Sequence, residues 1–310
     1  MSDTVSHKVH KALKLRLYPS EEQKVILNKT FGCCRVVYNE RLTEHISYYN
    51  TYKDDPNRPK FKVTYPKELR EKKYPWLGED TIAEALMQSQ RNCERAYSNF
   101  FKSLKKGKKV GYPKFKSKKS HKDSFTLYEI KKKGLIDFDS RTIVIPKLKN
   151  TEFRIANSSL KSKWIEWFLE AIPCSMTISR NACGEYYCSI TFEKEQDLEQ
   201  NIKLSNSIGL DFSPSNLYID SNNNSAPNYK PYKQINKKKL TKLQRNLTRK
   251  QKGSKNREKA RVKLARFEKH ISDSRKDYIE KETLRLVRTY DVIGIEDLNL
   301  QGMMKFSHNA

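Results

Sequence analysis

Alternation of apolar and polar residues predicts strands on both sides of a helical segment in the first two-thirds of the chain. Residues 11–18 place Leu13, Leu15 and Leu17 between basic residues, the period of two that marks a strand with one buried face. Short runs of the same kind follow after residue 123, with glycine and proline at the turns. They favour a small β-barrel, and we expect the first strand to complete it. These predicted strands are Ser124–Glu129, Leu135–Phe138, Thr142–Pro146, Glu152–Ile155, Ser175–Arg180 and Tyr186–Glu193.

Helical patterns separate the first strand from the others. Ser20 followed by Gln23 has the spacing of a capping box at a helix N-terminus, and the apolar positions after it continue a helix that we expect to be interrupted near Gly32. Residues 80–104 place apolar side chains at steps of three and four, which predicts a second helix. Between these helices, residues 54–75 are rich in Pro, Lys and Tyr and are predicted to form a loop.

A polar and acidic linker at residues 194–206 precedes a different pattern, in which two apolar strands flank a helical hairpin. In the hairpin, apolar residues at steps of three and four form one seam. The predicted order is strand Ser207–Phe212, its hairpin partner Asn216–Asp220, a loop to Gln234, helices over residues 236–288 interrupted at Gly253–Ser254, and strand Val292–Leu298.

Both of these strands end in a carboxylate that follows a glycine by two residues. Because residues two apart share a face, Gly209 lies beside Asp211 and Gly294 beside Glu296, with no side chain crowding either acid, whereas Asp297 faces the other side. On adjacent strands the pair supplies two of the three acids with which an RNase H-like nuclease holds two Mg²⁺ ions. Only fourteen residues follow Glu296, so we expect an incomplete site. The alternative is that Asp211 only caps a turn.

Composition points to a nucleic-acid partner. The 310 residues include 63 Lys and Arg against 36 Asp and Glu, a formal net charge of +27, and nucleic acid is the commonest soluble polyanion. A basic membrane-surface protein would need an amphipathic anchor or a lipidation signal, and neither is found. The six cysteines include no CxxC pair, which predicts reduced core thiols in a cytoplasmic protein rather than zinc ligands or disulfides.

Two segments concentrate this charge. Residues 102–122 contain ten lysines and no acid, and Tyr112 and Phe115 lie among them as surfaces on which bases could stack. Residues 236–288 carry twenty Lys and Arg against six acids, an excess that favours a phosphate-facing surface over a solvated coiled coil. The alternative for Arg257, Arg275 and Lys276 is solvent exposure or pairing along the helix. The predicted nucleic-acid-binding residues are Lys114, Phe115, Lys116, Arg245, Arg249, Lys255, Asn256, Arg257, Arg275 and Lys276.

Several motifs, taken together and in order, resemble TnpB, the family of transposon-encoded RNA-guided nucleases from which the type V CRISPR effectors descend. The resemblance covers nearly the whole chain, and the combination is more specific than any single motif. The motifs are Lys14–Pro19, Gly32, Arg35–Asn39, Tyr112–Lys116, Gly209–Ser213, Gly253–Arg257, Arg275–Asp277 and Glu296–Leu298.

The resemblance implies an α+β multi-domain fold. A wedge β-barrel would comprise residues 1–18 and 106–200, an inserted helical recognition lobe residues 19–105, and a truncated RuvC domain residues 201–310 with its long helical hairpin. It also implies two partners, a guide RNA and double-stranded DNA beside a short adjacent motif. Asp211 and Glu296 take the positions of the first two catalytic acids. The family's zinc ribbon and last catalytic Asp are absent from this sequence, so we expect no zinc and weak Mg²⁺ binding at best.

These observations leave three functional hypotheses open. The first is an RNA-guided, sequence-specific DNA-binding protein of the bacterial nucleoid, nuclease-dead and acting as a transcriptional repressor. The second is an RNA-guided endonuclease whose C-terminal part is supplied in trans or was removed. The retained Asp211 and Glu296 favour this hypothesis. Whether the chain is an enzyme stays open, and the missing third acid favours a protein without nuclease activity. The third is a decayed transposon remnant, against which stable RNA binding would count. Strand-transfer chemistry has no support in the sequence.

Overall fold

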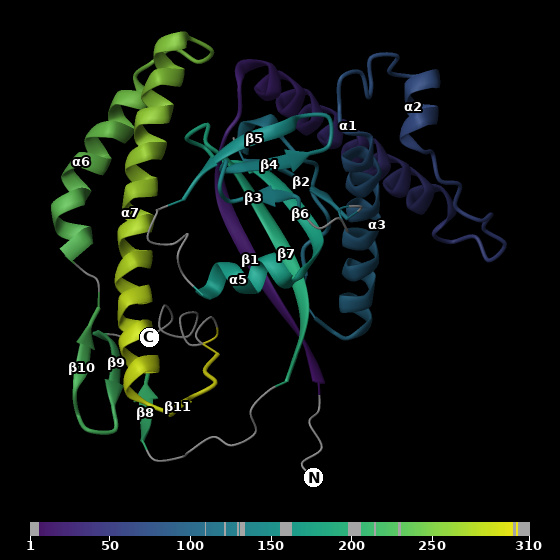
Figure 1. Cartoon of the computed structure of the whole chain (residues 1–310). Coiled ribbons are helices and arrows are strands. Elements are labelled where there is room, and N and C mark those ends of the chain that lie inside the picture. The colour runs from purple at the N-terminus through teal and green to yellow at the C-terminus, as the bar shows by residue number, and fades with distance from the viewer. Residues whose placement is uncertain are drawn as a thin grey trace. The chain divides into compact units, whose positions relative to one another are not determined.

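Two units make up the computed structural model of the chain (Figure 1). The first comprises Met1–Asp197 and the second Leu198–Ala310, and each is described separately. The structure describes residues 6–108, 110–120, 122–128, 130, 134–155, 163–197, 206–213, 215–228, 231–299 and 302.

A seven-stranded antiparallel sheet forms the centre of the first unit. β1 (Ser6–Tyr18) lies inside it, between β7 (Tyr186–Asp197) and β5 (Lys149–Arg154), and buries Leu13 and Leu15 as the alternation predicts. The order β2-β6-β7-β1-β5-β4-β3 leaves β2 and β3 at the two edges, so closure into the expected barrel stays a prediction. The remaining strands are β2 (Asp123–Leu127), β3 (Ile136–Asp137), β4 (Thr142–Ile145) and β6 (Ile172–Arg180).

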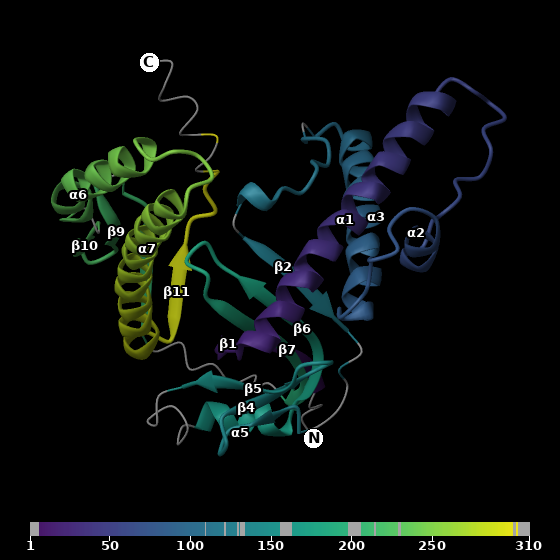
Figure 2. The same cartoon turned by 90° about the horizontal axis from the view of Figure 1, so that it is seen from above.

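Helices are inserted between β1 and β2 (Figures 1 and 2). α1 (Glu21–Tyr52) begins with the predicted capping box, in which the Ser20 hydroxyl accepts from the Gln23 backbone and the Gln23 side chain accepts from the Ser20 backbone. α3 (Ala83–Lys105) packs on α1, where the Ser89 hydroxyl donates to the carbonyl of Cys34 at 2.6 Å. Both helices contribute buried side chains to the core that the sheet forms.

The predicted interruption of α1 at Gly32 is wrong, because the helix is continuous from residue 21 to residue 52. A glycine inside a helix costs about 1 kcal/mol relative to alanine, which weakens the helix locally without breaking it. Phe31, Cys33 and Cys34 on either side of Gly32 are all buried, and their packing holds this turn helical.

Two short helices lie where the sequence does not predict helix. α2 (Pro66–Lys72) occupies part of the expected loop at residues 54–75 and begins with proline, whose fixed φ suits the first turn of a helix. α5 (Lys163–Glu170) follows β5, and its Phe168 packs against Phe192 of β7. At seven and eight residues, such helices depend on packing rather than on a long periodic pattern.

A polar cluster is buried between α1 and α3. The Arg41 guanidinium is only 2% exposed and forms ion pairs with Glu44 and Glu94 at 2.9 and 2.8 Å. Next to it, the His45 ring stacks between Phe61 and Tyr97, with ring centroids 4.5 and 4.2 Å away. Burial, with the Arg41 charge as a smaller cause, lowers the pKa of His45 to about 4. This histidine is therefore neutral near pH 7.

The second unit is built on a four-stranded sheet in the order β10-β9-β8-β11. β8 (Ser207–Asp211) pairs antiparallel with β9 (Asn216–Asp220) and parallel with β11 (Val292–Ile295), as the sequence predicts for the hairpin partner. β10 (Ser225–Pro227) lies within the segment that was expected to be loop and is too short to show a period of two.

Two helices form the crossover between β9–β10 and β11. α6 (Pro231–Thr248) and α7 (Lys255–Thr289) pack along the predicted apolar seam, with Leu264 and Phe267 of α7 buried. The C-terminal part of α7 covers one face of the sheet, where Leu286 packs with the strand residues (Figure 2). Within the described residues, no helix is both long and apolar enough to cross a membrane.

Candidate nucleic-acid interface and carboxylate pair

The parallel pairing of β8 and β11 brings the two predicted acids side by side. Gly209 pairs with Gly294 and Leu210 with Ile295, so one further step in the same register sets Asp211 opposite Glu296. Neighbouring strands run about 4.8 Å apart, and paired residues project from the same face. Both acids are exposed, and the opposite face packs on α7. The pair therefore presents two carboxylates on the uncovered face of this sheet.

Asn206 helps to set this register. Its backbone carbonyl accepts from the amides of Asp291 and Val292 at 2.8 and 3.2 Å, and its side-chain amide donates to the carbonyl of Thr289 at 2.7 Å. These bonds tie the residue before β8 to the end of α7 and the start of β11. Since a shift of one residue would turn a strand's side chains to the other face, Asn206 positions Glu296 beside Asp211.

The glycines preceding the acids leave room above the strands. A Cβ built at Gly209 would meet its nearest neighbour, the Ser221 Cβ, at 3.8 Å, and one at Gly294 would meet the Ile208 carbonyl at 3.8 Å. Both are ordinary van der Waals distances, so the protein's own packing does not demand glycine at either position. Each position therefore has space for one added methyl group beside its acid.

A buried acid nearby has a different role. Asp220, which ends β9, is 8% exposed and accepts from the backbone amides of Asn222 and Asn224 at 3.0 and 2.8 Å. It pairs with Leu210, whose side chain packs in the core beside α7, so Asp220 faces away from Asp211. Asp220 closes the turn between β9 and β10. Among the described residues of this sheet, the uncovered face (the open face, opposite α7) thus carries two acids in register and no third acid beside them.

A basic groove lies between the helices of the same unit. Its volume is about 1060 Å³, and seven of its ten lining residues are Lys or Arg, with no acid. The predicted residues Arg245 and Arg249 are exposed and line it, and Lys263 contributes from α7. Phosphate oxygens are the ligands that such a surface favours. The basic lining residues are Lys237, Lys238, Lys239, Lys242, Arg245, Arg249 and Lys263.

The motif at residues 253–257 builds the turn between α6 and α7. Gly253 has a φ of +85°, which favours glycine, and the Ser254 hydroxyl caps α7 by accepting from the Arg257 backbone at 3.1 Å. The Arg257 guanidinium donates to the carbonyls of Leu247 and Lys250 at 2.8 and 2.9 Å, at the C-terminal end of α6. The structure therefore gives this predicted phosphate ligand an intramolecular partner.

The other predicted residues of α7 are exposed. Lys255 and Asn256 lie in its first turn, while Arg275 and Lys276 lie near its middle. Lys276 pairs with Glu280 at 3.2 Å, four residues along the helix, which agrees with the predicted alternative of pairing along the helix. A pair of this kind contributes little to stability and can exchange for a phosphate.

The aromatic–lysine segment is held against the helical insertion of the first unit. Asn39 of α1 accepts from the Lys116 amide at 2.8 Å and donates to its carbonyl at 3.0 Å. Although the residue as a whole is exposed, the Lys116 ammonium turns inward and lies 4.2 Å from the Tyr38 ring centroid. Burial of this ammonium lowers the pKa of Lys116. The neighbouring Lys114 and Phe115 side chains are exposed, Phe115 by 54%.

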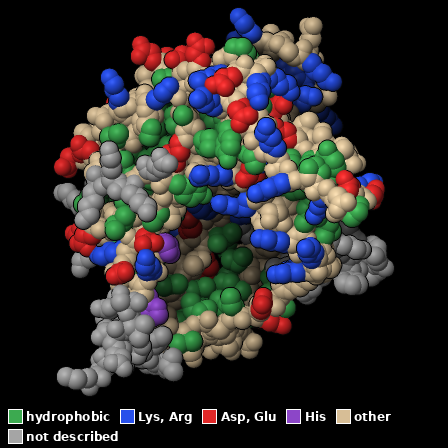
Figure 3. Space-filling view, turned by 90° about the vertical axis from the view of Figure 1, so that its right-hand side faces the viewer, with side chains coloured by type: hydrophobic (Ala, Val, Ile, Leu, Met, Phe, Trp, Pro, Cys, Tyr) green, Lys and Arg blue, Asp and Glu red, His purple; other side chains and the backbone are tan. Residues whose placement is uncertain are grey.

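Phe115 lines a pocket of about 370 Å³ between α1 and the start of β2. Asp123 also lines this pocket and bridges two cations, Arg35 at 2.8 Å and Arg180 at 2.5 Å. The space-filling view in Figure 3 shows Lys and Arg side chains gathered on the protein surface. An exposed aromatic ring beside fixed cations is the arrangement that can stack a base and bind its phosphate.

Comparisons with known proteins agree in pointing to one family. A family model described as "Probable transposase" (OrfB_IS605) matches residues 189–307, and one described as "Helix-turn-helix domain" matches residues 8–54. In this structure, residues 8–54 fold as most of β1 followed by the single continuous helix α1.

Two curated relatives share the name "Putative RNA-guided DNA endonuclease". The one from Streptomyces pristinaespiralis is 28% identical over 300 residues, covering 96% of this chain and 69% of the relative. The one from Escherichia coli K12, InsQ, is 30% identical over 297 residues, covering 95% of this chain and 67% of the relative. A solved structure described as "Cas12f1-sgRNA-target DNA complex" aligns with a TM-score of 0.50 at 12% identity, covering 94% of this chain and 81% of that one. This likeness shows a similar mixed α/β fold.

Proposed function

This chain is a member of the TnpB family, and from that premise we propose that it is an RNA-guided, sequence-specific DNA-binding protein. In this proposal a guide RNA pairs with the target strand, and the protein holds the heteroduplex by its backbone and contacts a short adjacent DNA motif. The curated relatives are named as RNA-guided, and the structural neighbour was solved with guide RNA and target DNA. The basic groove and the exposed Phe115 are the surfaces we assign to these partners.

The domain assignment follows from the same premise. We assign the seven-stranded sheet to a wedge domain, the helices between β1 and β2 to a recognition lobe, and the second unit to a partial RuvC domain of the RNase H type. The strand arrangement supports the last assignment, because an antiparallel meander of three strands is followed by a parallel fourth strand after a helical crossover.

We further propose that this 310-residue chain binds its target without cutting it and represses transcription by occupying a promoter. One observation carries this step: the open face of the second sheet presents Asp211 and Glu296 in register, with no third acid among its described residues. The pair fits a divalent cation, since carboxylate oxygens are the ligands Mg²⁺ prefers, and bound Mg²⁺ would polarise a phosphate there. Two-metal cleavage needs ligands that hold both ions about 3.5–4 Å apart, and two carboxylates leave that set incomplete.

The test reconstitutes the complex from its own RNA. The chain is expressed from its native locus, the RNA that copurifies is sequenced, and the complex is incubated with matched and scrambled DNA in Mg²⁺. We expect one discrete RNA, a mobility shift with matched DNA only, intact DNA, and repression of a reporter whose promoter carries the target. Absence of a discrete RNA would refute RNA guidance, and cleavage that Asp211→Ala abolishes would refute the non-cutting proposal.

A second candidate, an RNA-guided endonuclease, is favoured by a specific observation. The parallel register sets Asp211 and Glu296 side by side on an uncovered face, with glycines before both, which is the geometry that metal-assisted cleavage uses. The curated relatives are named as endonucleases. This candidate requires a third acid, supplied by another chain or by sequence beyond residue 310. Reading the gene past codon 310 and repeating the cleavage assay with any further polypeptide separates the two candidates.

A further inference from the structure

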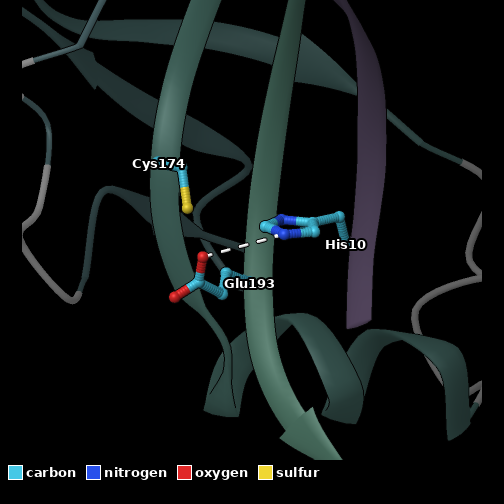
Figure 4. Close-up of side chains that lie close together, drawn as sticks. All are labelled: His10, Cys174 and Glu193. Atoms are coloured by element: carbon cyan, nitrogen blue, oxygen red, sulfur yellow. Dashed lines mark ion pairs between the residues drawn. The ribbon is translucent and has the colours of Figure 1, made fainter. Parts of the chain in front are cut away.

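We propose that the first unit binds a zinc ion through His10, Cys174 and Glu193, a site independent of the RNA-guided function. The three residues lie on β1, β6 and β7, which are neighbours in the sheet, and Figure 4 shows their side chains together on one side of these strands. The ligand atoms, one from each side chain, all lie within 4.8 Å of one another. This is the one such cluster of three or more His, Cys, Asp or Glu among the described residues.

Strand pairing brings the ligands together from distant parts of the sequence. His10 and Glu193 are direct partners in the antiparallel β1–β7 ladder, and the His10 Nε2 lies 3.8 Å from a Glu193 carboxylate oxygen. Cys174 lies at an irregularity in the β6–β7 register, between Pro173 and Ser175, so a local departure from regular pairing occurs at the thiol. Bulges of this kind redirect a side chain at a sheet edge or a binding site.

The donor set selects the metal by its chemistry. An imidazole nitrogen, a thiolate and a carboxylate oxygen are the three ligand types that Zn²⁺ takes, whereas Mg²⁺ and Ca²⁺ prefer oxygen alone. Three protein ligands with water in a fourth position complete a tetrahedral site. On binding, Cys174 releases its thiol proton to solvent, and the two anionic ligands balance the charge of the ion. His10 is exposed and Cys174 and Glu193 are half-buried, so side-chain rotation would have to bring the donors from within 4.8 Å of one another to zinc distances of about 2.0–2.3 Å.

A competing cation sits beside the site. The Lys8 ammonium donates to a Glu193 carboxylate oxygen at 3.1 Å. The ammonium lies on the Glu193 Oε1 and His10 on the Oε2, so the charge of Lys8 opposes a second cation at the carboxylate and weakens zinc binding without Lys8 being a ligand. Removing the Lys8 ammonium should therefore strengthen zinc binding. No such effect is expected if Glu193 is not a zinc ligand. Of the other five cysteines, all are buried, which leaves Cys174 as the accessible thiol.

The experiment uses the untagged, reduced full chain and titrates it with Zn²⁺ and with Co²⁺. We expect one ion per chain, a thiolate-to-cobalt charge-transfer band, and protection of Cys174 from alkylation by zinc. Cys174→Ser, His10→Gln and Glu193→Gln should each weaken binding at least about tenfold, since even loss of an outer hydrogen-bond partner costs about that much. Far-ultraviolet circular dichroism checks that each variant remains folded.

Two matched variants make the test specific. Lys8→Met should tighten zinc binding about two- to fivefold, the range expected for removing one exposed ion pair. Glu152→Gln removes an exposed acid from β5 of the same sheet, opposite Tyr18 and outside the cluster, and should leave zinc affinity unchanged. Binding that survives Cys174→Ser, or a cobalt complex without the charge-transfer band, would overturn the site. Failure of the wild-type chain to bind zinc would overturn it as well, without bearing on RNA guidance.

Discussion

Replacing Arg257 by alanine separates a structural role from a nucleic-acid contact. From its basic segment Arg257 is predicted to be a phosphate ligand, whereas in the structure its guanidinium donates to two carbonyls at the C-terminal end of α6. The last four carbonyls of a helix have no partner within the helix, and a cation placed there also interacts favourably with the helix dipole. We expect Arg257→Ala to loosen the end of α6 and the turn that follows it.

The magnitude follows from those contacts. A hydrogen bond from a charged donor contributes about 1.5–3 kcal/mol, and the dipole interaction adds about 0.3–1 kcal/mol. Arg257 is half-buried, so water replaces part of both bonds when the guanidinium is lost. We therefore expect the free energy of local opening to fall by about 2 kcal/mol, which corresponds to about 30-fold faster amide exchange near residues 247–250.

Hydrogen exchange followed by mass spectrometry measures this directly in the full chain. Arg249→Ala is the matched control, because Arg249 is exposed and lines the basic groove. Among the described residues, Arg249 makes no side-chain hydrogen bond to the helix end, so its replacement should change exchange much less than Arg257→Ala does, but weaken nucleic-acid binding and reduce the slope of log affinity against log salt by about 1. If Arg257→Ala leaves exchange unchanged and instead reduces the salt slope, Arg257 contacts phosphate and the capping argument is refuted.

Three further predictions follow from single residues. Gly32→Ala should raise the free energy of unfolding by up to about 1 kcal/mol in thermal melts, because a Cβ there meets nothing within 4 Å; a loss of stability would show that the position needs glycine. Phe115→Ala should leave the melting temperature unchanged but weaken RNA binding in gel-shift titrations by about 1–3 kcal/mol if the exposed ring stacks a base. The folded-state pKa of His45, about 4, lies below its ordinary value of 6.5, so stability should be complete above pH 6.5 and fall as the pH drops toward 4. His45→Phe should remove that part of the pH dependence, and an unchanged urea midpoint between pH 6.5 and 4.5 in the parent chain would contradict it.

Local patterns in the sequence determined most of the elements. Ser20 and Gln23 mark the start of α1 because a capping box needs only residues three apart. The alternation around Leu15 locates β1, and Gly253 with Ser254 locates the turn between α6 and α7, since each depends on short-range sterics and burial. The sequence alone also identified Asp211 and Glu296 as strand-end acids and located the two most basic segments, residues 102–122 and 236–288.

Only the tertiary structure decided where side chains separated along the chain meet. The register that sets Asp211 opposite Glu296 depends on the crossover through α6 and α7 and on bonds from Asn206, none of which a local pattern encodes. The same holds for Arg257, whose charge serves a helix end, and for Cys174, which meets His10 and Glu193 only through strand pairing. Helix propensity and capping act over a few residues, so the sequence predicts them. The register of strand pairing and the partners of distant side chains are set by packing of the whole sheet, and only the folded chain shows them.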